Sequence, residues 1–108
     1  MTLNEQQVRQ LEVLCVCPHH KRKHLLKIVP NSCIKAISEC CHNLLCGNIK
    51  ISKGQKKTLT PYKTVLRTLA QKRVPLSKKR DLLVQKGNGI LSILIPAAIT
   101  AISSLLSR

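Results

Sequence analysis

Thiol and imidazole side chains, which bind zinc or act as nucleophiles, are concentrated in two short segments of this 108-residue chain. The first runs from Cys15 to His20, and the second from Cys40 to Cys46. Neither contains the C-x-x-C pair that is typical of structural zinc sites, and Cys46 follows Cys41 at a spacing that does not stack two ligands on a helix. We therefore interpret the cysteines as small apolar side chains or free thiols, and we expect no metal and no cofactor.

Carboxylates are scarce, and this argues against catalysis. The four acids are Glu5, Glu12, Glu39 and Asp81, and their spacing offers no carboxylate pair for general acid–base chemistry. No glycine-rich phosphate loop opens a predicted helix. We therefore expect that the protein is not an enzyme.

Positive charge is the feature with the clearest chemical meaning. Nineteen Lys and Arg against four acids give a net charge of +15, and all of this net charge lies between residues 21 and 86. A solvated lysine face is one interpretation, but such an imbalance destabilises a compact state unless counter-charge arrives, so we predict a polyanionic partner. Lysine outnumbers arginine and Tyr62 is the sole aromatic residue, which favours phosphate contacts over base stacking or base reading. The candidate phosphate-binding residues are Lys21, Arg22, Lys23, Lys53, Lys56, Lys57, Lys72, Arg73, Lys78, Lys79 and Arg80.

Hydrophobic periodicity and capping signals predict an all-α fold of four to six short helices in a small bundle. The predicted helices cover residues 4–14, 21–29, 31–46, a segment that begins at Thr60-Pro61, 78–86 and the C-terminal stretch. We expect Asn31 or Ser32 and Ser77 to cap helix starts, and Gly47 to adopt the left-handed conformation at a helix end. Residues 49–52 are predicted to be an extended link before a lysine-rich turn, and residues 87–89 a flexible hinge.

The C-terminal stretch, residues 89–106, contains no charge. Three interpretations stay open: a segment in or across a membrane, a hydrophobic tail that is removed or docks on a capsid, or the buried core helix of the domain. For the first two, the docking residues are Ile90, Leu91, Ile93, Leu94, Ile95, Ile99 and Ile102.

The segment from Gly87 to Ile99 resembles the C-terminal part of pX, the precursor of the adenovirus mu core protein, in which a basic region precedes a double glycine and an apolar tail. The wider layout, with Asn43-Leu44-Leu45-Cys46-Gly47-Asn48 and Leu82-Leu83-Val84-Gln85-Lys86-Gly87, is similar to pX-like proteins of adintoviruses and Maverick/Polinton-type elements. The resemblance implies a virion core protein that condenses double-stranded DNA. It also implies cleavage by a viral cysteine protease between Asn88 and Gly89.

The sequence thus predicts a short N-terminal helix and linker (1–20), a basic helical nucleic-acid-binding region (21–86), a glycine hinge (87–89) and an apolar C-terminal helix (90–108). The predicted function is non-enzymatic, sequence-nonspecific DNA binding in a virion core or host nucleus, with the tail docked on capsid protein or membrane. The alternatives are a membrane-active or membrane-anchored basic protein that binds anionic lipid, and a small zinc-stabilised interaction module.

Overall fold

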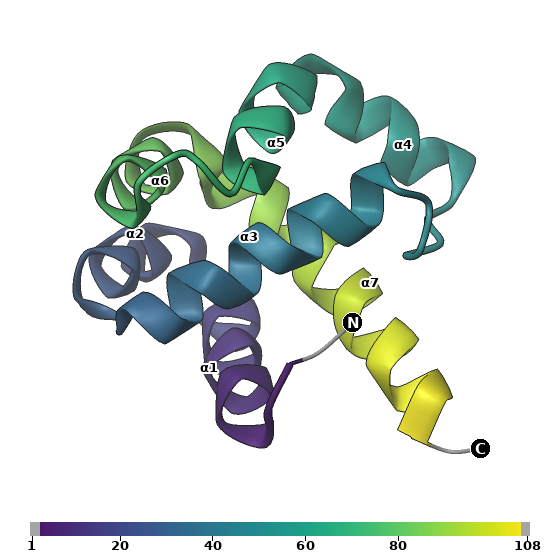
Figure 1. Ribbon diagram of the computed structural model, residues 1–108, viewed down its shortest axis with the longest axis horizontal. Coiled ribbons are helices and arrows are strands. Elements are labelled where there is room, and N and C mark those ends of the chain that lie inside the picture. The colour runs from purple at the N-terminus through teal and green to yellow at the C-terminus, as the bar shows by residue number, and fades with distance from the viewer. Residues whose placement is uncertain (1–2, 107–108) are drawn as a thin grey trace.

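The computed structural model describes the backbone of residues 3–106 and the side chains of residues 3–87 and 89–101. Every regular element in this part of the chain is a helix, so the all-α prediction is confirmed (Figure 1). In chain order the elements are α1 (Glu5–Val16), α2 (His19–Ile28), α3 (Asn31–Leu45), α4 (Lys53–Leu59), the 3-10 turn η1 (Thr60–Tyr62), α5 (Lys63–Ala70), α6 (Leu76–Leu82), the π-helical segment η2 (Leu83–Gly87) and α7 (Asn88–Leu106).

Helix α3 is the central element, and it packs against α1, α5, α6 and α7 (Figure 1). Ile34, Ile37 and Cys41 on α3 are completely buried, as their helical spacing predicts. Leu45, which continues the same apolar spacing, is 43% exposed because α3 ends at this residue. The core is built from Leu, Ile, Ala and Cys side chains, and it excludes water without any fully buried aromatic residue among those described.

Gly47 terminates α3 as predicted, with a φ of +81°. The amide of Asn48 donates to the carbonyl of Asn43, and that of Gly47 donates to the carbonyl of Leu44. These two bonds satisfy carbonyls that the end of a helix leaves without partners, and the first requires the left-handed turn at glycine.

Two of the predicted helix starts are wrong in detail. Neither Asn31 nor Ser32 caps α3, because the helix begins directly after Pro30, whose carbonyl accepts the first intrahelical bonds. Ser77 likewise lies inside α6, which begins after Pro75. In both places the fixed φ of proline starts the helix without a side-chain cap.

The lysine-rich turn predicted after residue 52 is the helix α4. Ser52 and Gln55 form a reciprocal capping box: the Ser52 hydroxyl accepts from the Gln55 amide at 3.1 Å, and the Gln55 side chain accepts from the Ser52 amide at 2.9 Å. The Ser-x-x-Gln pattern is the sequence signal for this helix start. No separate helix begins at Thr60-Pro61 as predicted, because the Thr60 hydroxyl donates to the carbonyl of Lys56 and α4 continues through η1 into α5.

The predicted glycine hinge is helical. Residues 83–87 form η2, and α7 begins at Asn88, although the chain direction changes by 110° between Leu76–Gly87 and Gly89–Ala101. Gly87 is buried, and a Cβ atom there would lie 2.7 Å from Leu83 Cδ2. Close packing against Leu83, rather than a loop conformation, therefore favours glycine at the bend.

Helix α7 supplies part of the core. Ile90, Leu91, Leu94 and Ile95 are each at most 1% exposed, and the helix packs against α1, α2 and α3. Of the three interpretations of the C-terminal stretch, the structure shows the buried core helix for residues 90–98.

Candidate nucleic-acid interface

Eight of the eleven predicted phosphate-binding residues have exposed side chains: Lys21, Lys23, Lys53, Lys56, Lys57, Lys72, Arg73 and Lys78. The other three, Arg22, Lys79 and Arg80, point into the protein and hold helices together. For these three, the assignment to a DNA-contacting surface is corrected.

Arg22 is 4% exposed and caps the C-terminal end of α1. In a continuous helix the carbonyl of Leu14 would accept from the amide of residue 18, but residue 18 is proline and has no N–H. Arg22 Nε donates to that carbonyl at 2.8 Å, and Arg22 Nη1 donates to Ser92 Oγ at 2.9 Å. One guanidinium therefore links α1, α2 and α7.

Arg80 does the same for α2. Pro30 leaves the carbonyl of Leu26 without its helical donor, and Arg80 Nη1 donates to this carbonyl at 2.9 Å. Arg80 Nη2 also donates to Asn31 Oδ1 at 3.0 Å, and the residue is half-buried. The rigid fork of N–H groups in arginine suits both capping roles better than an ammonium would.

Lys79 is 3% exposed, and its Nζ donates to Ser38 Oγ at 2.7 Å. The Ser38 hydroxyl in turn donates to the carbonyl of Leu69, near the end of α5, at 2.6 Å. Burial lowers the pKa of the Lys79 ammonium, and the nearby Cys41 thiol opposes this effect. This lysine is thus integrated into the contact between α3, α5 and α6.

The exposed basic residues form a belt over α4, α5, the link 71–75, α6 and α2; we call it the basic belt. Its elements are continuous in space, since η1 contacts both α4 and α5, α5 contacts α6, and α6 contacts α2. In Figure 1 the elements that carry the belt lie along the top and left of the molecule, with α4 and α2 on opposite sides. The belt includes one acid, Asp81 on α6.

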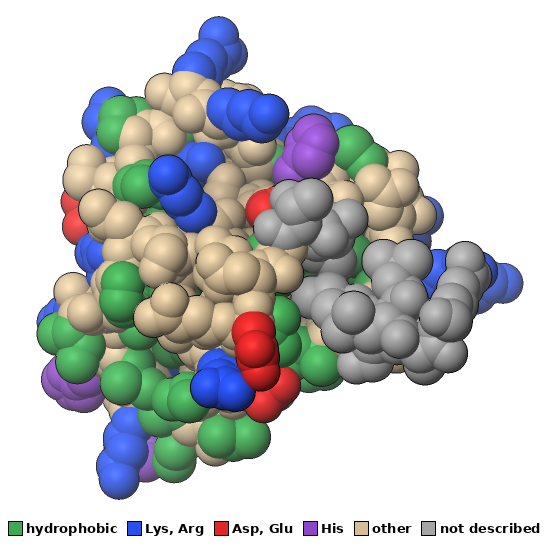
Figure 2. All heavy atoms as spheres, turned by 60° about the horizontal axis from the view of Figure 1, so that its bottom comes forward, with side chains coloured by type: hydrophobic (Ala, Val, Ile, Leu, Met, Phe, Trp, Pro, Cys, Tyr) green, Lys and Arg blue, Asp and Glu red, His purple; other side chains and the backbone are tan. Residues whose placement is uncertain are grey.

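The remaining side of the protein, formed by α1 and α7, is not basic. Helix α1 carries Glu5, Glu12 and Arg9, with a 2.8 Å ion pair between Arg9 and Glu5, and α7 has no charged residue. Figure 2 brings this side forward and shows acidic side chains near its centre, beside a Lys or Arg side chain, with further Lys and Arg side chains toward the top and the edges. The charge is therefore segregated in space as well as in sequence.

Sequence reasoning missed three members of the belt, Lys27, Lys63 and Arg67. Lys27 is exposed on α2. Lys63 and Arg67 are exposed on α5, between the lysines of α4 and those of the link and α6. They lie outside the apolar stripe of α5, whose Leu66 and Leu69 are buried. The same periodicity that predicts the helix could have found them.

The predicted docking residues do not form an exposed surface. Ile90, Leu91, Leu94 and Ile95 are buried in the core, Ile93 and Ile99 are half-buried, and the side chain of Ile102 lies outside the described part of the structure. The predicted cleavage position, Asn88-Gly89, lies at the helical start of α7. Since proteases bind extended substrates, cleavage there requires local unfolding.

The six cysteines are free thiols. Cys33, Cys40 and Cys41, the α3 thiols, are buried, and burial raises the pKa of Cys33 to about 11 and that of Cys40 to about 12. Among the described residues, no three His, Cys, Asp or Glu side chains are grouped as metal ligands would be.

Among the residues described with side chains, 3–87 and 89–101, no individual helix has the length and hydropathy of a membrane span. Leu76–Gly87 and Gly89–Ala101 reach that length and composition only as a pair, across their 110° bend. Comparisons of the chain with protein-family models, with curated proteins and with solved structures find no match.

Proposed function

We propose that this protein is a non-enzymatic DNA-binding protein that neutralises and bridges double-stranded DNA through phosphate contacts, without reading base sequence. The basic belt carries this proposal. Its exposed Lys and Arg side chains have one acidic neighbour on the same elements, Asp81, and its lysine-rich composition suits diffuse phosphate contacts.

The dimensions of the protein fit this role. The molecule measures 35 × 30 × 30 Å. With one phosphate per ~3.4 Å of each strand, a 30 Å face covers about nine base pairs. Because α2 and α4 lie on opposite sides of the molecule, two duplexes can contact the belt at once (Figure 1). A protein that bridges two duplexes condenses DNA.

The resemblance to pX-like proteins supports a place for this activity in the core of an adenovirus-like virion or in the nucleus of its host. In that setting the partners are double-stranded DNA, capsid protein and the viral protease. The folded helical bundle differs from a disordered basic peptide, because it presents its charges from fixed positions.

The test is fluorescence anisotropy of a random-sequence duplex titrated with the full-length chain. Replacing Lys53, Lys56 and Lys57 on α4 by Gln removes three phosphate contacts. At 0.15 M salt each contact contributes roughly fivefold through counterion release, so the triple variant should bind on the order of 100-fold more weakly. Arg9→Gln is the control, because Arg9 lies on α1 outside the basic belt, and it should change affinity less than about twofold.

A parallel titration with anionic liposomes separates DNA from lipid as the partner. The proposal expects duplex binding by the wild-type chain that the triple variant loses. Tight liposome binding together with negligible duplex binding would instead establish a protein of the membrane surface.

A further inference from the structure

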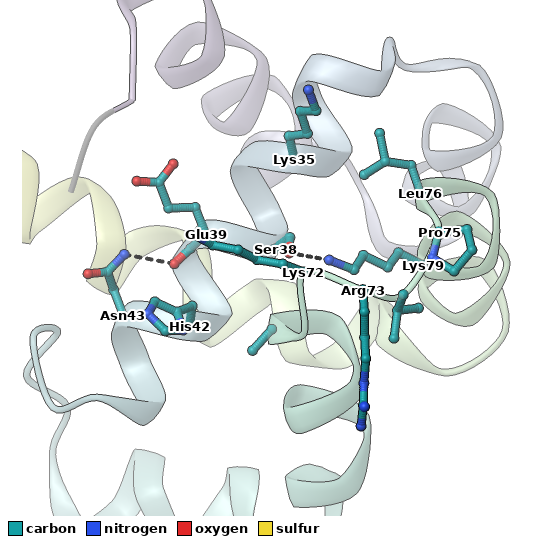
Figure 3. Close-up of a pocket in the computed structure, with 12 residues that line it drawn as sticks. Lys35, Ser38, Glu39, His42, Asn43, Lys72, Arg73, Pro75, Leu76 and Lys79 are labelled. Atoms are coloured by element: carbon teal, nitrogen blue, oxygen red, sulfur yellow. Dashed lines mark hydrogen bonds between the residues drawn. The ribbon is translucent and has the colours of Figure 1, made fainter.

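A pocket of about 770 Å³ lies beside the buried amine of Lys79, between α3 and the link that joins α5 to α6 (Figure 3). Lys35, Glu39 and His42 line it from α3, and Lys72 and Arg73 line it from the link. With Lys79, four Lys and Arg residues therefore line a space that has one carboxylate in its lining. The volume is typical of small-molecule sites.

The ammonium of Lys79 has unused hydrogen-bonding capacity. An ammonium group has three N–H donors, and in this structure one of them is used by Ser38 Oγ. No carboxylate of the described residues forms an ion pair with Lys79. A buried cation without a paired anion is costly, so natural proteins bury lysine where a counter-charge binds or where a neutral amine is used.

The arrangement of the neighbouring side chains points to a bound anion. Figure 3 shows Lys79 extending across the pocket to Ser38, with Lys72 extending over the same region. Lys35 and Arg73 point away from Lys79, in opposite directions, so Lys79 and Lys72 are the cations of the site. The Ser38 hydroxyl is anchored to the carbonyl of Leu69, so the Lys79 amine is held in a fixed position.

We infer that this pocket binds the terminal phosphate of a small phosphorylated molecule, with Lys79 as the buried phosphate-binding cation and Lys72 at the entrance. A phosphate monoester carries close to two charges and three acceptor oxygens, so it can use several N–H donors at once. Ala70, Val74 and Leu76 form an apolar wall against which the organic part of such a molecule can pack. Lys72 and Arg73 belong both to this pocket and to the basic belt, whereas the buried Lys79 does not belong to the belt.

The experiment measures thermal unfolding and calorimetric titration of the full-length chain with adenosine monophosphate and with inorganic phosphate, at fixed ionic strength. Both probes should raise the melting temperature of the wild-type protein, and Lys79→Met should weaken their binding at least tenfold. The control is Lys78→Met, which removes the same charge from the exposed neighbouring position on α6 and should change binding less than twofold. Equal losses in the two variants, or no saturable binding to the wild-type chain, would overturn the inference.

A second measurement does not depend on the folding of a variant. Amine acylation of the wild-type protein followed by mass spectrometry should show that adenosine monophosphate protects the exposed Lys72 at the pocket entrance, whereas Lys78 is labelled at the same rate with and without it. Unchanged labelling of Lys72 at saturating probe contradicts the site.

Binding of duplex DNA distinguishes this site from the proposed function. Lys79→Met should bind a random duplex as tightly as the wild-type chain, because its charge is not on the exposed belt. A different result would be that Lys79→Met loses duplex binding and that the wild-type chain does not bind small phosphates. The pocket would then bind a phosphate of the DNA backbone. In that case the small-molecule inference is wrong and the DNA-binding proposal stands.

Discussion

Replacement of Arg22 by methionine tests whether this arginine caps α1, as the structure shows, or binds phosphate, as its charge alone predicts. The variant keeps the length of the side chain and removes its donors. The bonds from Arg22 to the Leu14 carbonyl and to Ser92 Oγ, at 2.8 and 2.9 Å, have good geometry, and the two contacts at 3.3 Å to the carbonyls of Cys15 and Cys17 add less.

A hydrogen bond from a charged donor contributes about 1.5 kcal/mol or more, so the loss of two should lower the free energy of unfolding by about 3 kcal/mol. In a domain of this size that corresponds to a fall in melting temperature of about 15 °C. The carbonyl of Leu14 has no alternative donor, because Pro18 has no N–H.

The assay is urea unfolding followed by circular dichroism at 222 nm. Lys23→Met is the matched control: it removes the same charge from the adjacent exposed position on α2 and should change stability by no more than about 0.5 kcal/mol. If Arg22→Met unfolds within that margin of the wild type and instead loses affinity for DNA, Arg22 is a phosphate-binding residue and the capping argument is refuted.

Three further predictions follow from burial and packing. Iodoacetamide should modify the exposed Cys46 in the folded protein while the α3 thiols react only after denaturant is added, as read by mass spectrometry; equal rates would contradict the buried positions. Burial raises the pKa values of the α3 thiols above the ordinary 9.0, so their contribution to stability is complete below pH 9 and is lost as the pH rises toward 11 to 12. The urea midpoint should therefore fall between pH 8 and pH 10.5. The lowered pKa of Lys79 acts in the opposite direction. Gly87→Ala should destabilise the protein by about 1–3 kcal/mol, because the added Cβ overlaps the buried Leu83 side chain. Gly54→Ala, at an open helical position, should stabilise it by about 0.5 kcal/mol. Denaturant midpoints that move in the same direction for both variants would disprove the close approach at Gly87.

Helix class and core were predictable where the pattern is strong and local. The spacing of Ile34, Ile37 and Cys41 predicts the buried face of α3, and Gly47 predicts its end, because both depend on short-range geometry. The capping box that starts α4 was also visible in the sequence, as Ser52 and Gln55 three residues apart. The lysine-rich segment around it instead favours the interpretation as a turn.

The inward-pointing cations were not predictable from local sequence. Arg80 caps a carbonyl 54 residues away, and Lys79 contacts Ser38 over 41 residues, so their partners are known only once the helices have packed. A proline four residues after a carbonyl is a partial sequence signal for side-chain capping. Pro18 and Pro30 indicate that the carbonyls of Leu14 and Leu26 need hydrogen-bond donors, but they do not indicate which residues supply them. The uncharged C-terminal stretch is ambiguous for the same reason, since a core helix and a membrane helix share a composition.

The salt dependence of duplex binding tests the central claim most directly. If about six phosphates contact one stretch of the basic belt, the logarithm of the association constant for a random duplex should fall against the logarithm of salt concentration with a slope of about −5, a loss on the order of 1,000-fold between 50 and 200 mM. The slope should be the same for duplexes of different sequence. Binding that is absent at 50 mM salt, or whose slope is near zero, would contradict a protein that holds DNA by its phosphates.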